Sequence, residues 1–94
     1  MVKIIIKRRV AVGKEAELLP LLVKLRALAT SQPGYISGET LRNIEDPEEY
    51  LVISTWQSIE HWKEWLASKE RAEIQDQIDH ILGDKTQYSA YLYG

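Results

Sequence analysis

The segment spanning residues 50–66, YLVISTWQSIEHWKEWL, constrains the fold most because its hydrophobic period changes part-way along. Up to Trp56, β-branched and aromatic residues dominate and alternate as in a strand, where successive side chains point to opposite faces. After Ser58, whose hydroxyl can cap a helix N-terminus, apolar residues recur at helical spacing. These residues are Ile59, Trp62 and Leu66, with Trp65 beside them. The segment therefore predicts a buried strand that leads directly into a short helix carrying two of the three tryptophans.

The same two periods organise the rest of the 94-residue chain, which suits a single domain over residues 1–94. Alternating apolar residues predict strands over residues 2–10, 35–43 and 86–93. Spacings of three and four predict helices over residues 14–31 and 68–82. Pro20 is expected to kink the first helix, or to leave a loose first turn before a helix that begins near Leu19. The order β-α-β-β-α-β, with the second helix broken in two, predicts an α+β, ferredoxin-like fold with an antiparallel four-stranded sheet.

Three of the predicted strands are apolar on both faces. Consecutive apolar residues occur at positions 4–6, 51–53 and 91–93. In this fold the helices cover one face of the sheet, and the other face can meet water only if it is polar. We therefore expect a second copy of the chain to cover that face, giving a homodimer in which Ile5 or Ile53 is buried.

Composition excludes several classes of function. The net charge of −2 and the pI of about 5.7 argue against nucleic-acid binding, which needs a basic surface. The absence of cysteine excludes disulfides, Cys-ligated zinc and thiol catalysis. The start, MVKIIIKRRV, has too short an apolar run for a signal peptide or membrane span, so we expect a cytoplasmic protein with no membrane partner.

Few side chains point to chemistry by themselves. His61 and His80 are the only histidines, and we expect both to be structural residues at the surface or half-buried, too few for a metal site. The basic run at residues 7–9 has two interpretations, a solvated strand end, which we favour, and an anion-binding site. Arg8 interrupts the apolar face of its strand. No catalytic triad, phosphate loop or pair of catalytic carboxylates can be assembled, so the catalytic residues are not assigned.

Several short motifs resemble those of a known family. They are Gly13 before the first helix, Pro33-Gly34-Tyr35 before the second strand, Trp56-x-Ser58, and Trp65-Leu66-x-Ser68. Together they resemble the antibiotic biosynthesis monooxygenase domain, over nearly the whole chain. The resemblance implies a dimeric α+β barrel, made of two ferredoxin-like units packed sheet to sheet. The family includes quinone-forming monooxygenases without cofactors and haem-degrading enzymes.

The stretch from Trp56 to Ser68 is most similar to the haem-degrading branch. That branch has an Asn on its first strand, a Trp on the short helix, and an iron-ligating His ten residues beyond. The Trp matches Trp65, but Gln75 stands at the His position and Ile6 or Lys7 at the Asn position. The resemblance therefore predicts no haem turnover. The quinol-oxidising branch has an Asn four residues before its strand tryptophan, where this chain has Val52.

These observations leave two functions open. The first is a small monooxygenase that acts on an aromatic or quinol-like molecule with neither a bound metal nor another cofactor. The alternative is a non-catalytic dimeric module that binds a small hydrophobic ligand; a pocket filled by side chains would favour a purely structural role. In either binding function we expect the site between the sheet and the short helix. The candidate substrate-binding residues are Trp65, Trp62, Gln75 and His61. Trp65 and Gln75 are expected at the edges of apolar helix stripes, facing one shared space.

Overall fold

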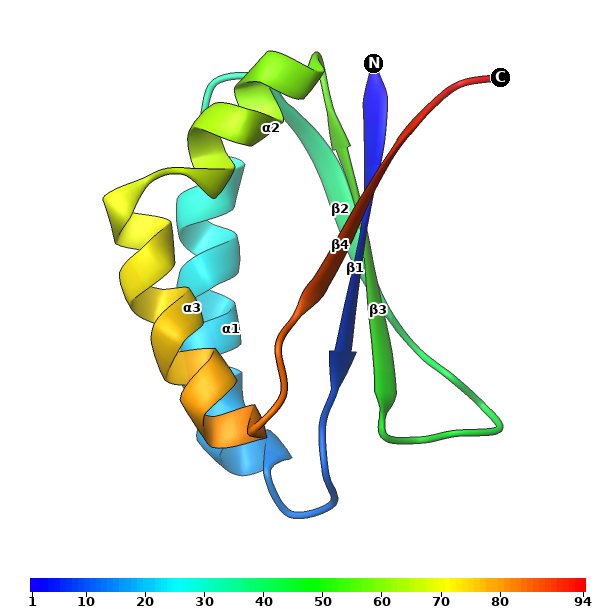
Figure 1. Ribbon diagram of the computed structural model, residues 1–94, viewed down its shortest axis with the longest axis vertical. Helices are drawn as coiled ribbons and strands as arrows, with labels where there is room; N and C mark the ends of the chain where they lie inside the picture. The colour runs from blue at the N-terminus through cyan, green and yellow to red at the C-terminus, as the bar shows by residue number, and fades with distance from the viewer.

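The computed structural model describes residues 1–94 and has the predicted order of elements, with its helices and its sheet forming two layers (Figure 1). The elements are β1 (Val2–Arg9), α1 (Glu15–Thr30), β2 (Tyr35–Arg42), β3 (Glu49–Trp56), α2 (Ile59–Leu66), α3 (Lys69–Leu82) and β4 (Gln87–Leu92). The sheet order is β2-β3-β1-β4, and every neighbouring pair is antiparallel. The ferredoxin-like α+β fold with its four-stranded antiparallel sheet is thereby confirmed.

Capping side chains set the helix boundaries much as the sequence predicts. Ser58 accepts a hydrogen bond from the backbone N–H of His61 at the start of α2, and Ser68 caps α3 in the same way. Gly83 ends α3 with φ 74°, a left-handed conformation that glycine adopts without strain. Of the two expectations for Pro20, the late start of the first helix is wrong, since α1 begins at Glu15 and continues through Pro20, and the kink stays a prediction. Leu18, which is 1% exposed, anchors that first turn in the core.

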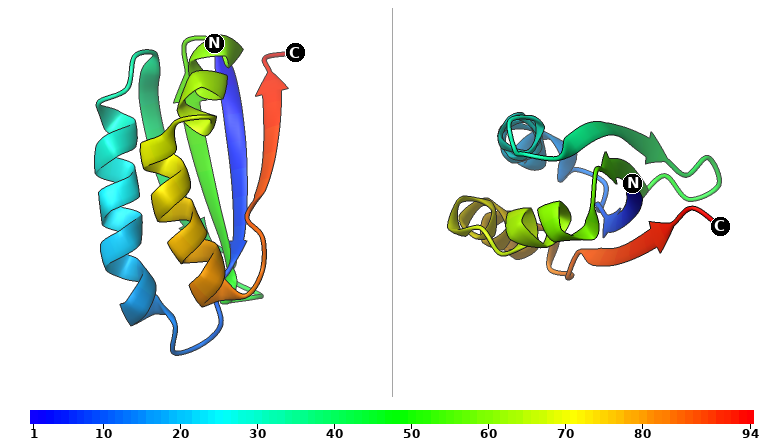
Figure 2. Two further views of the ribbon diagram at one scale, coloured as in Figure 1. Left: turned by 60° about the vertical axis from the view of Figure 1, so that its left-hand side comes forward. Right: turned by 90° about the horizontal axis from the view of Figure 1, so that it is seen from above.

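Alternation along β1 decides which side chains enter the core. Val2, Ile4 and Ile6 point toward the helices and are buried. With Trp56, Trp62 and Trp65 they form one hydrophobic cluster, and a second cluster joins Val10 and Leu18 to Ile74 and Ile78 of α3. All three helices lie on the same side of the sheet (Figure 2). The core therefore lies between one helical layer and one sheet face.

The opposite face of the sheet has no cover within the chain. Ile5 pairs with Ile53 across β1 and β3, and both are only partly buried. Tyr91 follows on β4 and is 57% exposed. Lys3 and Lys7 lie on the same face of β1. This face is thus apolar at its centre, with charged residues among the apolar ones.

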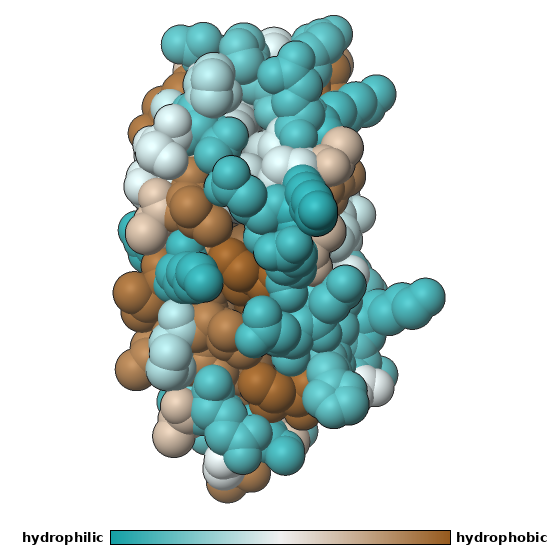
Figure 3. All heavy atoms as spheres, turned by 90° about the vertical axis from the view of Figure 1, so that its left-hand side faces the viewer, coloured by the Kyte–Doolittle hydropathy of each residue, from teal (hydrophilic) through white to brown (hydrophobic).

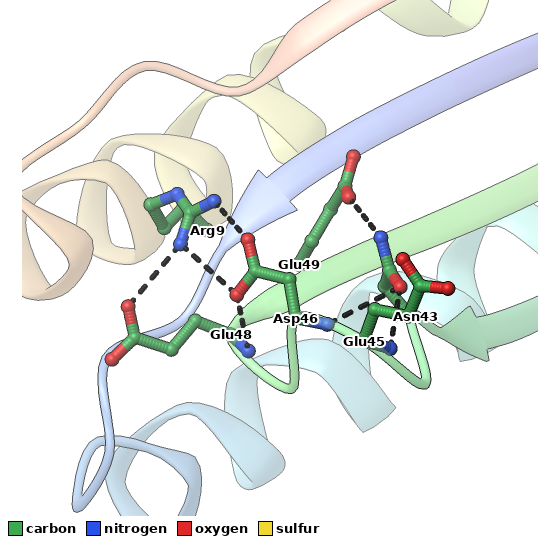
Figure 4. A network of polar contacts seen from close by, with 6 residues as sticks. All are labelled: Arg9, Asn43, Glu45, Asp46, Glu48 and Glu49. Atoms are coloured by element: carbon green, nitrogen blue, oxygen red, sulfur yellow. Dashed lines mark hydrogen bonds and ion pairs between the residues drawn. The ribbon is translucent and has the colours of Figure 1, made fainter.

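Polar contacts close the turn between β2 and β3 (Figure 4). Arg9 at the end of β1 forms ion pairs with Asp46 and Glu48. Asn43 donates to Glu49 at 2.7 Å, and its side-chain oxygen accepts the backbone N–H of Asp46 at 3.2 Å. Arg9 is therefore a surface residue of the turn, as a solvated strand end requires.

No helix in the structure has the length and apolar character needed to cross a membrane.

Candidate functional site

A cavity of about 360 Å³ lies between α1 and the face of the sheet formed by β1, β2 and β3. Of the 19 residues that line it, 13 are hydrophobic. Its volume falls within the roughly 300–1,000 Å³ typical of small-molecule sites, which are mostly apolar with a few polar groups. The space is therefore large enough and apolar enough to hold an organic molecule.

The helical wall of the cavity is one face of α1. It consists of Leu19, Leu22, Val23, Leu25, Arg26 and Ala29. Leu19 and Val23 are 61% and 60% exposed, so they form the rim, whereas Leu22, Leu25 and Ala29 are half-buried and lie deeper. On the surface of the helical layer, apolar side chains run between hydrophilic ones (Figure 3). A ligand would enter along this apolar part of the surface.

Aromatic rings close one end of the cavity. The ring of Tyr35 meets Trp56 edge-on, with centroids 5.4 Å apart and planes at 89°, and Trp56 packs against Trp62 at 5.8 Å. Trp62 in turn packs against Tyr88 of β4 at 5.8 Å. The indole N–H of Trp56 donates to Ser54 at 2.7 Å, so this buried donor is satisfied. The arrangement presents a fixed aromatic surface to any ligand in the cavity.

Arg8 lies at the opposite end of the cavity, beside Tyr50 in the register of β1 and β3. Its side chain is on the helix-facing side of the sheet, and the residue is only 8% exposed. Nη2 donates to the side-chain oxygen of Gln75 at 3.3 Å, whereas the buried Nε has no hydrogen-bond partner. The ion pairs of the protein involve Arg9 and Lys14, not Arg8. Burial lowers the pKa of Arg8, because a charged group loses hydration there.

A partly buried hydrogen-bond network joins Arg8 to α3 and to the segment before β4. Gln75 donates from Nε2 to Asp79 and to Thr86, each at 2.8 Å, while its oxygen accepts from Arg8. Arg71 donates to the backbone oxygen of Leu66 and to the hydroxyl of Tyr88. Burial, as the largest influence, raises the pKa of Tyr88 although both arginines oppose it. The network fixes the guanidinium of Arg8 without neutralising it.

The cavity brings together two of the four residues proposed from the sequence. Trp62 and Trp65 both line it, at the aromatic end. Trp65, expected at the edge of its helix stripe with one side toward a cavity, is 5% exposed; it packs in the core cluster and also lines the cavity. Gln75 does not face the same space as Trp65. It is 6% exposed and lies within the polar network that joins Arg8 to α3.

His61 lies outside the cavity lining and has a structural environment. Its Nδ1 is 2.6 Å from the hydroxyl of Ser58, the N-cap of its own helix. Its ring packs against Gly34, where an added Cβ would come within 2.3 Å of the imidazole. Gly34 also has φ 84°, so the close approach and the backbone both require glycine. His80 is exposed on α3, and no group of three or more His, Asp or Glu side chains could hold a metal ion.

Comparison with known proteins decides the family. Residues 1–77 match the family model described as antibiotic biosynthesis monooxygenase. The chain belongs to this family. The predicted resemblance is thereby confirmed, since the match covers more than three-quarters of the sequence.

Individual relatives of this family member are distant. The chain is 26% identical over 73 residues to Protein SchA of Streptomyces halstedii, covering 78% of the chain and 19% of SchA. It spans about a fifth of the length of the curated relatives it matches. A conserved protein from Methanosarcina mazei Go1 has a TM-score of 0.89 at 19% identity, over 99% of this chain and 92% of that one. A variant of SnoaB, a cofactor-independent oxygenase from Streptomyces nogalater, has a TM-score of 0.84 at 16% identity, over 98% and 91% of the two chains.

The position at which the haem-degrading branch has its iron ligand is unsuited to that role in this family member. The resemblance puts Gln75 at this position, and in the structure its amide is engaged by Arg8, Asp79 and Thr86. At the first-strand position, Ile6 lines the cavity with an alkyl side chain and Lys7 points to the other sheet face. The residues of this chain therefore do not fit the ligand set of the haem-degrading enzymes.

Sequence reasoning missed two features of the cavity, the wall supplied by α1 and the buried Arg8. The wall could have been found from the leucine-rich segment of residues 18–29. For Arg8 the signal was its position in the alternation, on the same face as Ile4 and Ile6. The favoured interpretation of residues 7–9 as a solvated strand end is correct for Lys7 and Arg9 and wrong for Arg8.

Proposed function

We propose that this protein is a small monooxygenase acting on an aromatic or quinol-like molecule held in the cavity between α1 and the sheet. The cavity itself carries the proposal, because it combines apolar walls with a fixed aromatic end and few polar groups. Family membership supports the class of reaction. SnoaB, which shares the fold, is described as a cofactor-independent oxygenase, and we extend that mode of action to this chain.

In this reaction the main roles of the protein are to bind the substrate and to exclude water from it. An electron-rich aromatic substrate loses a proton from its reacting carbon and passes electrons to O₂. One oxygen atom then enters the substrate as a carbonyl, replacing two hydrogens, and the other leaves as water. The apolar walls shield the reactive carbanion from water, and the polar end orients the substrate. Trp62 and Trp65 are proposed to contact the ring system, while Gln75 acts through Arg8 rather than on the substrate.

We also propose that two copies of the chain pack through the uncovered sheet face. Ile5 and Ile53 form the apolar centre of that face, and Tyr91 extends it. A stable interface of this kind buries on the order of 2,000 Å² or more in total, which the sheet face can supply only if most of it takes part. The cavity lies on the opposite side of the sheet, so each copy would carry its own site.

The alternative function, non-catalytic binding of a small hydrophobic ligand, uses the same cavity. The two functions differ in oxygen consumption. Hydroquinones and anthrones are offered to the protein in air while dissolved oxygen and product absorbance are followed. Enzyme-dependent oxygen uptake matched by carbonyl product supports the oxygenase, whereas saturable binding without uptake supports the binding module.

Blocking the cavity tests its role in either function. Val23→Trp places an indole at the rim, where the residue is exposed, so the fold should tolerate it. Ala27→Trp is the matched control, an exposed α1 residue outside the cavity lining. We expect Val23→Trp to weaken ligand binding or turnover at least about tenfold, and Ala27→Trp to leave both within about threefold, since tenfold corresponds to 1.4 kcal/mol. Equal effects of both variants would contradict the assignment of the cavity as the site.

A further inference from the structure

The cavity contains a cation, Arg8, that forms no ion pair within the protein. Arg8 is only 8% exposed. Its single hydrogen bond runs from Nη2 to the neutral amide of Gln75 at 3.3 Å. Its Nε is the only buried side-chain nitrogen or oxygen in the protein without a hydrogen-bond partner. A buried, unpaired cation with a free N–H is unfavourable, so its position needs an explanation.

The other arginines near the cavity already have partners. Arg26 lies exposed on α1 and donates to the backbone oxygen of Gly38. Arg42 donates to the hydroxyl of Tyr50, and Arg71 is satisfied on the far side of the network. Among the cavity-lining residues, Arg8 is therefore the cation that is both buried and incompletely bonded.

We propose that the cavity takes an aromatic molecule bearing one ionised oxygen, a carboxylate or a phenolate, and that Arg8 binds this oxygen. This inference rests on the proposed function and adds the chemical class of its ligand. The guanidinium supplies a charge-assisted hydrogen bond at the polar end of the cavity. The apolar remainder of the ligand lies along Ile6 and Val52 toward the aromatic end at Trp56.

The network that joins Arg8 to α3 suits this role. The oxygen of Gln75 accepts from Nη2, and its Nε2 is held by Asp79 and Thr86, so the amide cannot turn away. Asp79 is the nearest carboxylate of the network, but it bonds Gln75 and Thr86 rather than Arg8. Gln75 is thus a positioning residue that holds one side of the guanidinium and leaves its charge available to a ligand.

The test compares two probes of nearly equal shape, 2-naphthoate and 2-naphthamide. Their dissociation constants are measured by isothermal titration calorimetry at neutral pH for the wild-type protein, Arg8→Met and Arg9→Met. Met keeps the length of the arginine stem, and Arg9→Met removes the same charge from the adjacent residue on the opposite, exposed face. Thermal unfolding of each variant checks that it is folded. If Arg8→Met does not fold, Arg8→Gln takes its place.

We expect the wild-type protein to bind 2-naphthoate roughly tenfold to hundredfold more tightly than 2-naphthamide, as a hydrogen bond to a charged group implies. Arg8→Met should abolish that preference by weakening naphthoate binding, and Arg9→Met should preserve it. Equal binding of the two probes to the wild-type protein, or a preference that survives Arg8→Met, would overturn the inference while leaving the cavity as a binding site. Binding of neither probe would overturn both the inference and the proposed function.

Discussion

Replacing Trp65 by alanine tests whether the aromatic end of the cavity is part of the core. The residue is 5% exposed and packs in a cluster with Trp56 and Trp62. Truncating a buried Trp or Phe to Ala costs roughly 3–5 kcal/mol of unfolding free energy. One side of the Trp65 ring borders the cavity, so it has fewer packing contacts to lose, and we expect a cost near the lower limit, about 3 kcal/mol.

Urea denaturation measures this cost directly. At a slope of about 1.5 kcal/mol per molar urea, a loss of about 3 kcal/mol lowers the unfolding midpoint by about 2 M. Tyr93→Ala is the control, because Tyr93 is an aromatic residue that is 59% exposed, and its loss should change stability by less than about 0.5 kcal/mol. A cost below about 1 kcal/mol for Trp65→Ala would show that the indole is not packed as the structure has it.

Two further predictions concern the sheet face and the family chemistry. Ile53→Asp places an unpaired carboxylate at the centre of the uncovered face, so it should shift the protein from dimer to monomer, or unfold it. Light scattering at micromolar concentration measures this shift, and Ile44→Asp, at a turn position that is 96% exposed, should not cause it. A wild-type monomer would contradict the proposed interface. Haem added with a reductant in air should show no enzyme-dependent loss of its Soret band, because Gln75 is engaged in the partly buried network; turnover at stoichiometric protein would refute this.

The elements of the fold could be predicted because each depends on local signals. Ser58 and Ser68 cap their helices as expected, and Gly83 ends the last one, since capping involves atoms only a few residues apart. The alternation along β1 also puts Ile4 and Ile6 on one face, and in the structure that face is buried. Local periodicity is enough to predict the structure where a side chain is buried by a single neighbouring layer.

The degree of burial of Arg8 and Trp65 could not be predicted from the sequence, because several distant elements determine it. Arg8 is covered in part by Gln75, which is 67 positions away in the chain. The short helix α2 contacts both β3 and α3, so its buried stripe is wider than contact with the sheet alone would make it, and Trp65 falls inside it. The period of a helix gives the direction of a side chain but not the number of elements packed around it.

The position of α1 explains why the cavity exists where it does. This helix contacts α3 and the edge strand β2 rather than packing closely on the central strands β1 and β3. At one end the large rings of Trp62 and Trp65 fill the space between the helical layer and the sheet, and at the other end the buried side chain of Arg8 does so. Between them the lining is made of smaller side chains, including Ala29, Gly38 and Val52, which leave the middle of the layer open. An apolar interior normally closes such a space, because unfilled volume forfeits packing energy. A cavity kept open between fixed aromatic rings and an unpaired arginine is therefore better explained by a bound aromatic anion than by packing alone.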